Sequence, residues 1–80
     1  MARTVFDTML GAYMRTFRKE KKIPIEFVAE ELEVSVPAVH YWETGQRQIS
    51  ASNLKRYCAC IGIKVQELFD AMDGMDGIEL

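Results

Sequence analysis

The feature that most constrains this chain is a pair of short helical patterns with only three residues between them. Apolar side chains recur at helical spacing over 24–32 and again over 36–43. Pro24 and Pro37 fall in the first turn of these segments, the one part of a helix that tolerates proline well. Because so short a connection forces two helices to cross steeply, residues 24–43 are expected to form one compact unit.

Three further helical patterns surround this pair. Residues 6–21 and 65–72 carry apolar side chains at helical spacing. Another helix is expected between Ser50, which can cap its start, and Gly62, which can end it. Five short helices joined by tight turns predict an all-α domain whose central pair is a helix-turn-helix motif.

The chain is expected to hold one domain. Its 80 residues are enough for a single core, and 49% of them are apolar. We assign residues 1–72 to this domain and residues 73–80, with two glycines and three acids, to a flexible acidic tail. No signal peptide is visible, and no stretch approaches the ~20 apolar residues that span a membrane. We therefore expect a cytoplasmic protein.

Residues that carry catalysis or bind metals are sparse. The sequence has one histidine, no Ser/His/Asp set and no glycine-rich phosphate loop. Cys58 and Cys60 are two positions apart on a helix and point to different sides, so we expect both to be reduced. These observations predict no enzyme, no cofactor and no metal site. The net charge is −2, but basic residues gather over 1–22 and 44–56, so one face can still be positive.

The segment over 28–45 reads VAEELEVSVPAVHYWETG and resembles the Xre/Cro-type helix-turn-helix family, the DNA-binding domains of lambdoid phage repressors. A small Ala29 suits a close helix crossing, Ser35 can cap the second helix, and Gly45 can reverse the chain after it. The resemblance extends over about residues 10–69. It implies a five-helix repressor-like fold and a sequence-specific DNA-binding transcriptional regulator that acts as a repressor.

In this family, the second helix of the motif enters the major groove of DNA. Here the matching residues lie around helix 36–43 and in the loop behind it: Ser35, Val36, Pro37, His40, Tyr41, Gln46 and Arg47. Val36 and Pro37 have no hydrogen-bonding side chain, so only thymine methyl groups suit them as base contacts. Ile25 replaces the glutamine that the family usually has at the start of the first motif helix.

The resemblance also implies a structural ion pair between Arg18 and Glu43, which would join the first helix to the third. A homodimer on double-stranded, near-palindromic operator DNA is the usual arrangement for such domains, because one copy reads only a few base pairs. The expected dimer surface lies on the last helix and comprises Val65, Phe69 and Met72.

A second function fits the same scaffold: a protein–protein interaction module, such as an anti-repressor, an antitoxin or an adapter, with weak or no DNA binding. The chain is acidic overall, and apolar residues occupy DNA-facing positions, namely Ile25, Phe27, Val36 and Pro37. Exposed apolar side chains there would anchor a protein partner. The salt dependence of binding separates the two functions, because contacts to DNA phosphates weaken steeply as salt rises.

Overall fold

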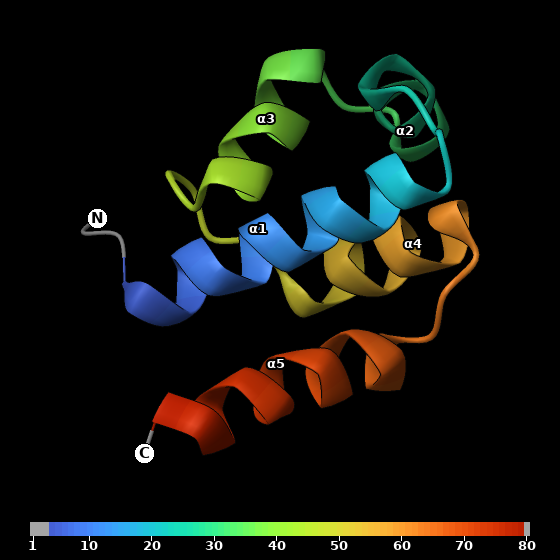
Figure 1. Ribbon diagram of the computed structural model, residues 1–80. Coiled ribbons are helices and arrows are strands. Elements are labelled where there is room, and N and C mark those ends of the chain that lie inside the picture. Colours follow the sequence, from blue (N-terminus) through green and yellow to red (C-terminus); the bar gives the residue numbers. More distant parts are fainter. Residues whose placement is uncertain (1–3, 80) are drawn as a thin grey trace.

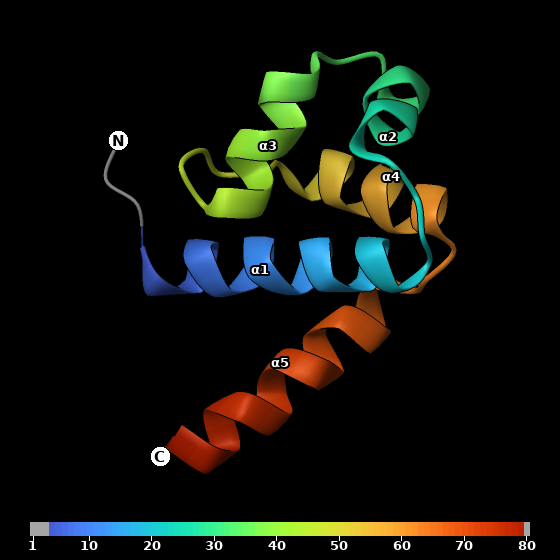
Figure 2. The same cartoon turned by 45° about the horizontal axis from the view of Figure 1, so that its top comes forward.

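The computed structural model describes residues 4–79, with side chains for residues 4–74. The described residues form five helices and no strand, which confirms the predicted all-α class: α1 (Val5–Glu20), α2 (Ile25–Leu32), α3 (Val36–Thr44), α4 (Ala51–Ile61) and α5 (Val65–Glu79). In Figure 1, α2 and α3 form one edge of the molecule and α5 forms the opposite edge. Figure 2 shows α1 running between α3 and α5, and α1 contacts both of them. No helix in the described part is long and apolar enough to cross a membrane.

Local chemistry sets most of the helix ends. The Ser35 hydroxyl accepts a hydrogen bond from the amide of Ala38 at 3.2 Å, and Ser50 caps α4 in the same way. Gly45 ends α3 with a φ of 76°, a conformation that glycine adopts without strain. The first motif helix was expected to include Pro24, but α2 starts one residue later, and Pro24 is its N-cap without a side-chain hydrogen bond.

The core forms around α1 and α4, which contact each other, the α2–α3 pair and α5. Its most deeply buried large side chains come from all five helices: Tyr57, Met14, Ile61, Leu68, Val28, Val39 and Cys58. Phe6 begins the apolar pattern over 6–21, yet 53% of its surface is exposed. Phe6 lies in the first turn of α1, at the end of the molecule, where few neighbours remain to cover it.

The last helix is longer than predicted. The sequence placed its end at about residue 72, whereas α5 continues through Glu79. Gly74 lies inside this extension, and apart from its chain neighbours and the adjoining backbone of α5, no atom of the described residues lies within 4 Å of where its Cβ would be. A glycine lowers helix stability by only about 1 kcal/mol relative to alanine and does not block the hydrogen-bond ladder as proline does. The predicted helix end at about residue 72 was therefore wrong, while the division into a domain over 1–72 and a flexible acidic tail stays a prediction.

Two glycines set the position of α3 against α1. A Cβ on Gly11 would lie 2.3 Å from the carbonyl oxygen of Trp42 and 2.6 Å from that of Glu43. A Cβ on Gly45 would lie 2.7 Å from the Cα of Thr8. Because backbone atoms occupy these places, the C-terminal end of α3 can approach α1 only where both side chains are absent.

Candidate nucleic-acid interface

The α2–α3 connection presents the start of α3 to solvent. Glu33 turns the chain with a left-handed φ of 59°, and the amide of Val34 donates to the carbonyl oxygen of Ala29 at 3.0 Å. Ala29 is buried at the crossing, as its small size predicts. This tight turn leaves the first residues of α3 exposed at the edge of the molecule that lies away from α5 (Figure 2).

The residues predicted to contact DNA form two groups. Ser35, Val36, Pro37 and His40 are exposed on the first turns of α3, and 36% of the Val36 surface is accessible. The second group, which we call the loop cluster, consists of Tyr41, Gln46 and Arg47 and surrounds a depression of about 250 Å³. The rings of His40 and Tyr41 lie 6.2 Å apart between their centroids, so the two groups adjoin on α3.

The loop cluster is held together around Tyr41. The carbonyl oxygen of Tyr41 accepts hydrogen bonds from the amide of Gln46 at 2.9 Å and from the amide of Arg47 at 3.2 Å. The guanidinium carbon of Arg47 lies 5.1 Å from the centre of the Tyr41 ring, within the range of a cation–π interaction. Arg47 forms no ion pair with any residue that the structure describes. Its guanidinium therefore keeps its N–H donors for an anion such as a phosphate.

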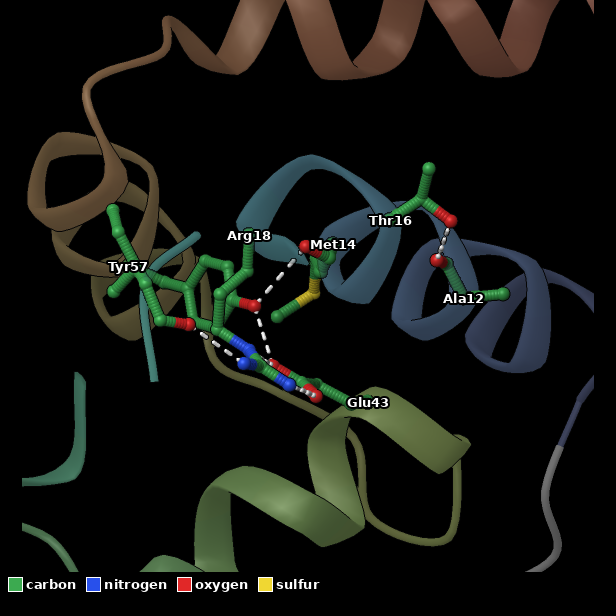
Figure 3. Close-up of polar contacts among 7 residues, drawn as sticks. Ala12, Met14, Thr16, Arg18, Glu43 and Tyr57 are labelled. Atoms are coloured by element: carbon green, nitrogen blue, oxygen red, sulfur yellow. Dashed lines mark hydrogen bonds and ion pairs between the residues drawn. The ribbon is translucent and has the colours of Figure 1, made fainter. Parts of the chain in front are cut away.

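Beneath this surface lies a buried cluster of Arg18, Glu43 and Tyr57 (Figure 3). Nε of Arg18 donates to Oε2 of Glu43 at 2.7 Å, and Nη2 donates to Oε1 at 2.9 Å, so the ion pair is bidentate. Nη1 donates to the carbonyl oxygen of Ile23 at 2.8 Å. The structure thus brings together the two residues of the predicted ion pair, and it ties α1 to α3 through them.

Tyr57 completes this cluster from α4. Its hydroxyl lies 2.5 Å from Oε2 of Glu43 and 3.1 Å from the carbonyl oxygen of Met14. The single hydroxyl hydrogen goes to the carboxylate, because a charged acceptor makes the stronger bond. Burial raises the pKa of Tyr57 well above its usual range, and the hydrogen bond to Glu43 raises it further. The hydrogen bonds that Arg18 donates to Glu43 raise the pKa of Arg18, so its guanidinium stays protonated.

Sequence reasoning missed Tyr57 and Gly11, although both left signals. Tyr57 stands three positions after Leu54 and four before Ile61, on the apolar face of α4. A buried tyrosine needs a partner for its hydroxyl, and this need points to a polar group in the core. Gly11 interrupts a helical pattern, and a glycine inside a helix indicates close approach of another backbone.

The residues predicted for a dimer surface are only partly accessible. Met72 is 3% exposed and packs in the core of the single chain, because the helical face that it shares with Leu68 turns inward. Val65 and Phe69 are half-buried. A notch of about 240 Å³ remains beside them, lined by Phe6, Gln66, Phe69, Met72 and Asp73.

The two cysteines differ in their surroundings and are both free. Cys58 is buried in the core, and burial raises the pKa of its thiol to about 11. Cys60 is half-buried, and burial also raises the pKa of its thiol. Both thiols are therefore protonated at neutral pH, which lowers their reactivity as nucleophiles.

The chain is similar in sequence and structure to proteins that are already characterised. The family described as helix-turn-helix matches residues 14–68. The clp gene regulator ClgR from C. glutamicum shares 26% identity and a TM-score of 0.82, over 91% of this chain and 94% of that one. The restriction-modification controller protein C.AhdI from Aeromonas hydrophila shares 25% identity and a TM-score of 0.76, over 81% and 98%. Wild-type C.Esp1396I, another such controller protein, has the same fold at 13% identity, with a TM-score of 0.80 over 89% and 93%. No curated protein matches the sequence.

Proposed function

The chain belongs to the helix-turn-helix family, and from this premise we propose that it regulates transcription by binding specific DNA sequences with α3. The observation that carries the proposal is an exposed α3 whose C-terminal end is fixed against α1 by a buried bidentate ion pair. A rigid, protruding helix start is what the major groove of DNA admits. ClgR is named as a gene regulator, and C.AhdI as a restriction-modification controller protein, which supports the same role for this chain.

The start of α3 offers very few hydrogen-bond donors to bases. Pro37 has no amide hydrogen, and the amide of Ala38 donates to Ser35. The amide of Val39 donates to the carbonyl oxygen of Ser35 at 3.3 Å. Base contacts in the first turn are therefore apolar, through Val36 and Pro37 to thymine methyl groups. His40 and Tyr41 supply the polar contacts to bases one turn later.

Phosphate contacts come from the two ends of α3. The Ser35 hydroxyl accepts a hydrogen bond from the amide of Ala38, and its own hydrogen can be donated to a phosphate oxygen. Arg47 and Gln46, both in the loop cluster, contact phosphates of the DNA backbone. Arg47 binds independently of sequence, whereas His40 and Tyr41 discriminate between base pairs.

The regulator acts as a homodimer and represses transcription from a near-palindromic operator. One α3 reads only a few base pairs, and two-fold pairing doubles the site. The notch beside Phe69, together with half-buried Val65, supplies the apolar contact between copies. Sedimentation of the protein at tens of micromolar tests this arrangement, and a monomer at that concentration contradicts a stable dimer.

The decisive experiment is fluorescence anisotropy with labelled duplex from the DNA that flanks the gene, at two salt concentrations and with random duplex as competitor. A DNA regulator binds the labelled duplex even in the presence of competitor, and its affinity falls steeply as the salt concentration rises. Arg47→Ala should weaken binding to all duplexes and lower the salt slope by about one, whereas changes at His40 or Tyr41 should alter sequence preference by about 1–3 kcal/mol at one base pair. Uniform effects of His40 and Tyr41 changes on all duplexes would contradict the assignment of α3.

A second candidate function is a protein-binding module on the same scaffold. The exposed apolar side chains favour it, since 43% of Phe27, in the first turn of α2, and 36% of Val36, at the start of α3, are accessible. Such a module binds duplex DNA weakly or not at all at low salt, and its affinity for a protein partner changes little as salt rises. Absence of salt-dependent DNA binding therefore favours this second function.

A further inference from the structure

The first turn of α3 carries only hydrocarbon side chains. Residues 36–39 read VPAV. Val39 is buried in the core, whereas Val36 and Pro37 are exposed, and 36% of the Val36 surface is accessible. Figure 1 shows that this turn lies at the edge of the molecule opposite α5. The helix that is proposed to enter DNA therefore begins with an open apolar surface.

This apolar surface is also stiff. The Ser35 hydroxyl accepts a hydrogen bond from the amide of Ala38, and the carbonyl oxygen of Ser35 accepts one from the amide of Val39 at 3.3 Å, so the first turn is fixed. Proline has no rotamers to lose, and valine is restricted at χ1 because it is β-branched. Contact between this turn and a small group on DNA therefore costs little side-chain entropy.

The same turn has no side chain that identifies a base by hydrogen bonds. An acidic side chain would accept a hydrogen bond from the N4 amino group of cytosine, an amide side chain would pair with adenine, and an arginine would pair with guanine. The first turn of α3 contains no acidic residue, and residues 36–39 include no amide or basic side chain. Val36 and Pro37 therefore sense a methyl group and not the base that carries it.

Two pyrimidines place a methyl group at the same point of the major groove. Thymine carries it at C5, and 5-methylcytosine carries it at the same carbon. The two bases differ at C4, where thymine has an oxygen and cytosine an amino group, and in the purine opposite. A hydrocarbon side chain forms no hydrogen bond with any of these groups. Loss of water from them disfavours methylated and unmethylated cytosine alike, so only the methyl group distinguishes these two bases at this contact.

We propose that the start of α3 binds 5-methylcytosine in duplex DNA as well as thymine, so that the affinity of the protein depends on the methylation of cytosines in its site. The proposal deepens the proposed function and rests on it. Val36 and Pro37 recognise the C5 methyl group by apolar contact, while His40 and Tyr41 read neighbouring base pairs through hydrogen bonds. Each contacted methyl group should raise the affinity about fourfold.

The test compares two pairs of duplexes at each thymine position of the operator. The first pair carries thymine or uracil opposite adenine, and the second carries 5-methylcytosine or cytosine opposite guanine. Within each pair only the methyl group differs, so the ratio of the two affinities measures the methyl contact alone. Anisotropy at one salt concentration gives the affinities. At a contacted position in each half-site, we expect both ratios to be about four.

Val36→Ala in the intact chain tests whether α3 is the source of this preference. The variant shortens the hydrocarbon side chain at the contact, so both ratios should fall towards one. Val5→Ala is the matched control, because Val5 is 78% exposed but lies at the start of α1. Both ratios should stay near four in the control, and circular dichroism shows whether each variant is folded.

The outcomes separate methyl recognition from the proposed function. A thymine–uracil ratio of about four together with a methylcytosine–cytosine ratio of one overturns the proposal alone. Raised ratios that Val36→Ala leaves unchanged also overturn it, because the methyl groups then act through the shape of the DNA. Ratios of one at every position, with wild-type protein that binds operator, have the same consequence. Wild-type protein that binds no duplex overturns the proposed function and the proposal together.

Discussion

The molecule contains two arginine–tyrosine pairs that share residue types and differ in one partner. In the buried cluster, Arg18 and Tyr57 converge on the carboxylate of Glu43. In the loop cluster, Arg47 lies over the ring of Tyr41, and no carboxylate joins them in the described part of the chain. The comparison teaches that the carboxylate decides the role of the arginine. Arg18, which is paired with a carboxylate, has a structural role. Arg47, which has no carboxylate partner in the described residues, can bind a phosphate.

The physical reason lies in solvation. Transfer of an isolated charge from water into a core costs several kcal/mol, so a buried arginine needs a paired carboxylate with further hydrogen bonds. In the buried cluster all three guanidinium nitrogens have acceptors, and no buried side-chain nitrogen or oxygen in the described residues lacks a partner. An exposed arginine carries no such requirement, because water solvates it until a ligand replaces the water.

Removing the buried arginine should have the largest effect. Arg18→Ala leaves the Glu43 carboxylate buried without its ion partner, and the free energy of unfolding should fall by about 3–5 kcal/mol. Urea unfolding followed by circular dichroism measures the loss. Arg47→Ala is the matched control, and it should change the free energy of unfolding by no more than about 0.5 kcal/mol. If Arg18→Ala leaves both the melting temperature and the DNA affinity unchanged, the structural role of the pair is wrong.

A triple replacement sharpens this prediction. Arg18→Met, Glu43→Leu and Tyr57→Phe together remove every charge and hydroxyl of the buried cluster. Apolar side chains of similar volume often restore the stability that a broken buried ion pair loses. If the triple variant recovers the free energy of unfolding, the stability lost in Arg18→Ala comes from the unpaired carboxylate. If the triple variant is as unstable as Arg18→Ala, the lost stability comes from packing.

The buried pair also depends on the close approach of α1 and α3. Gly11→Ala places a methyl group 2.3 Å from the carbonyl oxygen of Trp42, so the helices must separate. Overpacking of this kind costs about 1–3 kcal/mol. Gly74→Ala is the control, because the new Cβ in α5 meets no atom of the described residues outside the adjoining helix backbone within 4 Å, and the change should stabilise the helix slightly. Equal melting temperatures of the two variants would contradict the backbone contact at Gly11.

Tyr57→Phe removes one hydrogen bond from the buried cluster and leaves the ion pair in place. The free energy of unfolding should fall by about 1–2 kcal/mol at neutral pH. Tyr41→Phe, in the loop cluster, should change it by less than about 0.5 kcal/mol. Urea unfolding of the three proteins measures these differences.

The effect of Tyr57→Phe should shrink in alkali. Because burial raises the pKa of Tyr57, the folded protein keeps the phenol proton at a pH where the unfolded chain releases it. The unfolded state is then favoured as pH rises above about 10, the ordinary tyrosine pKa. Wild-type protein should therefore lose stability relative to Tyr57→Phe between about pH 10 and 11. A constant difference between the two proteins across this range would contradict the raised pKa.

The fold was predictable because local signals and apolar periodicity agree. Pro37, Ser35 and Gly45 mark the ends of α3 in the sequence, and the structure ends the helix where they indicate. The end of α5 was not predictable in the same way, because Gly74 weakens a helix without stopping it. Phe6 follows the apolar spacing of α1 and is still exposed, because periodicity gives the face of a helix but not how far its neighbours extend.

The site was less predictable than the fold. The Arg18–Glu43 pair followed from the resemblance. The helical spacing of Tyr57 indicates that it is buried, but its hydrogen bond to Glu43 depends on how the helices pack, which no local pattern gives. Burial, and with it the role of each polar residue, is a property of the assembled helices.

The smallest expected effect tests the apolar start of α3, where neither arginine takes part. Val36 and Pro37 can recognise only the methyl group of thymine, so replacing thymine by deoxyuridine in the operator removes the contact and nothing else. A buried methyl is worth about 0.8 kcal/mol, so each critical replacement should weaken binding about fourfold at constant salt slope. Val36→Ala should reduce this sensitivity, and a cytosine methylated at the same carbon should restore part of the affinity. If uracil is tolerated at every position, α3 reads its operator through His40 and Tyr41 alone.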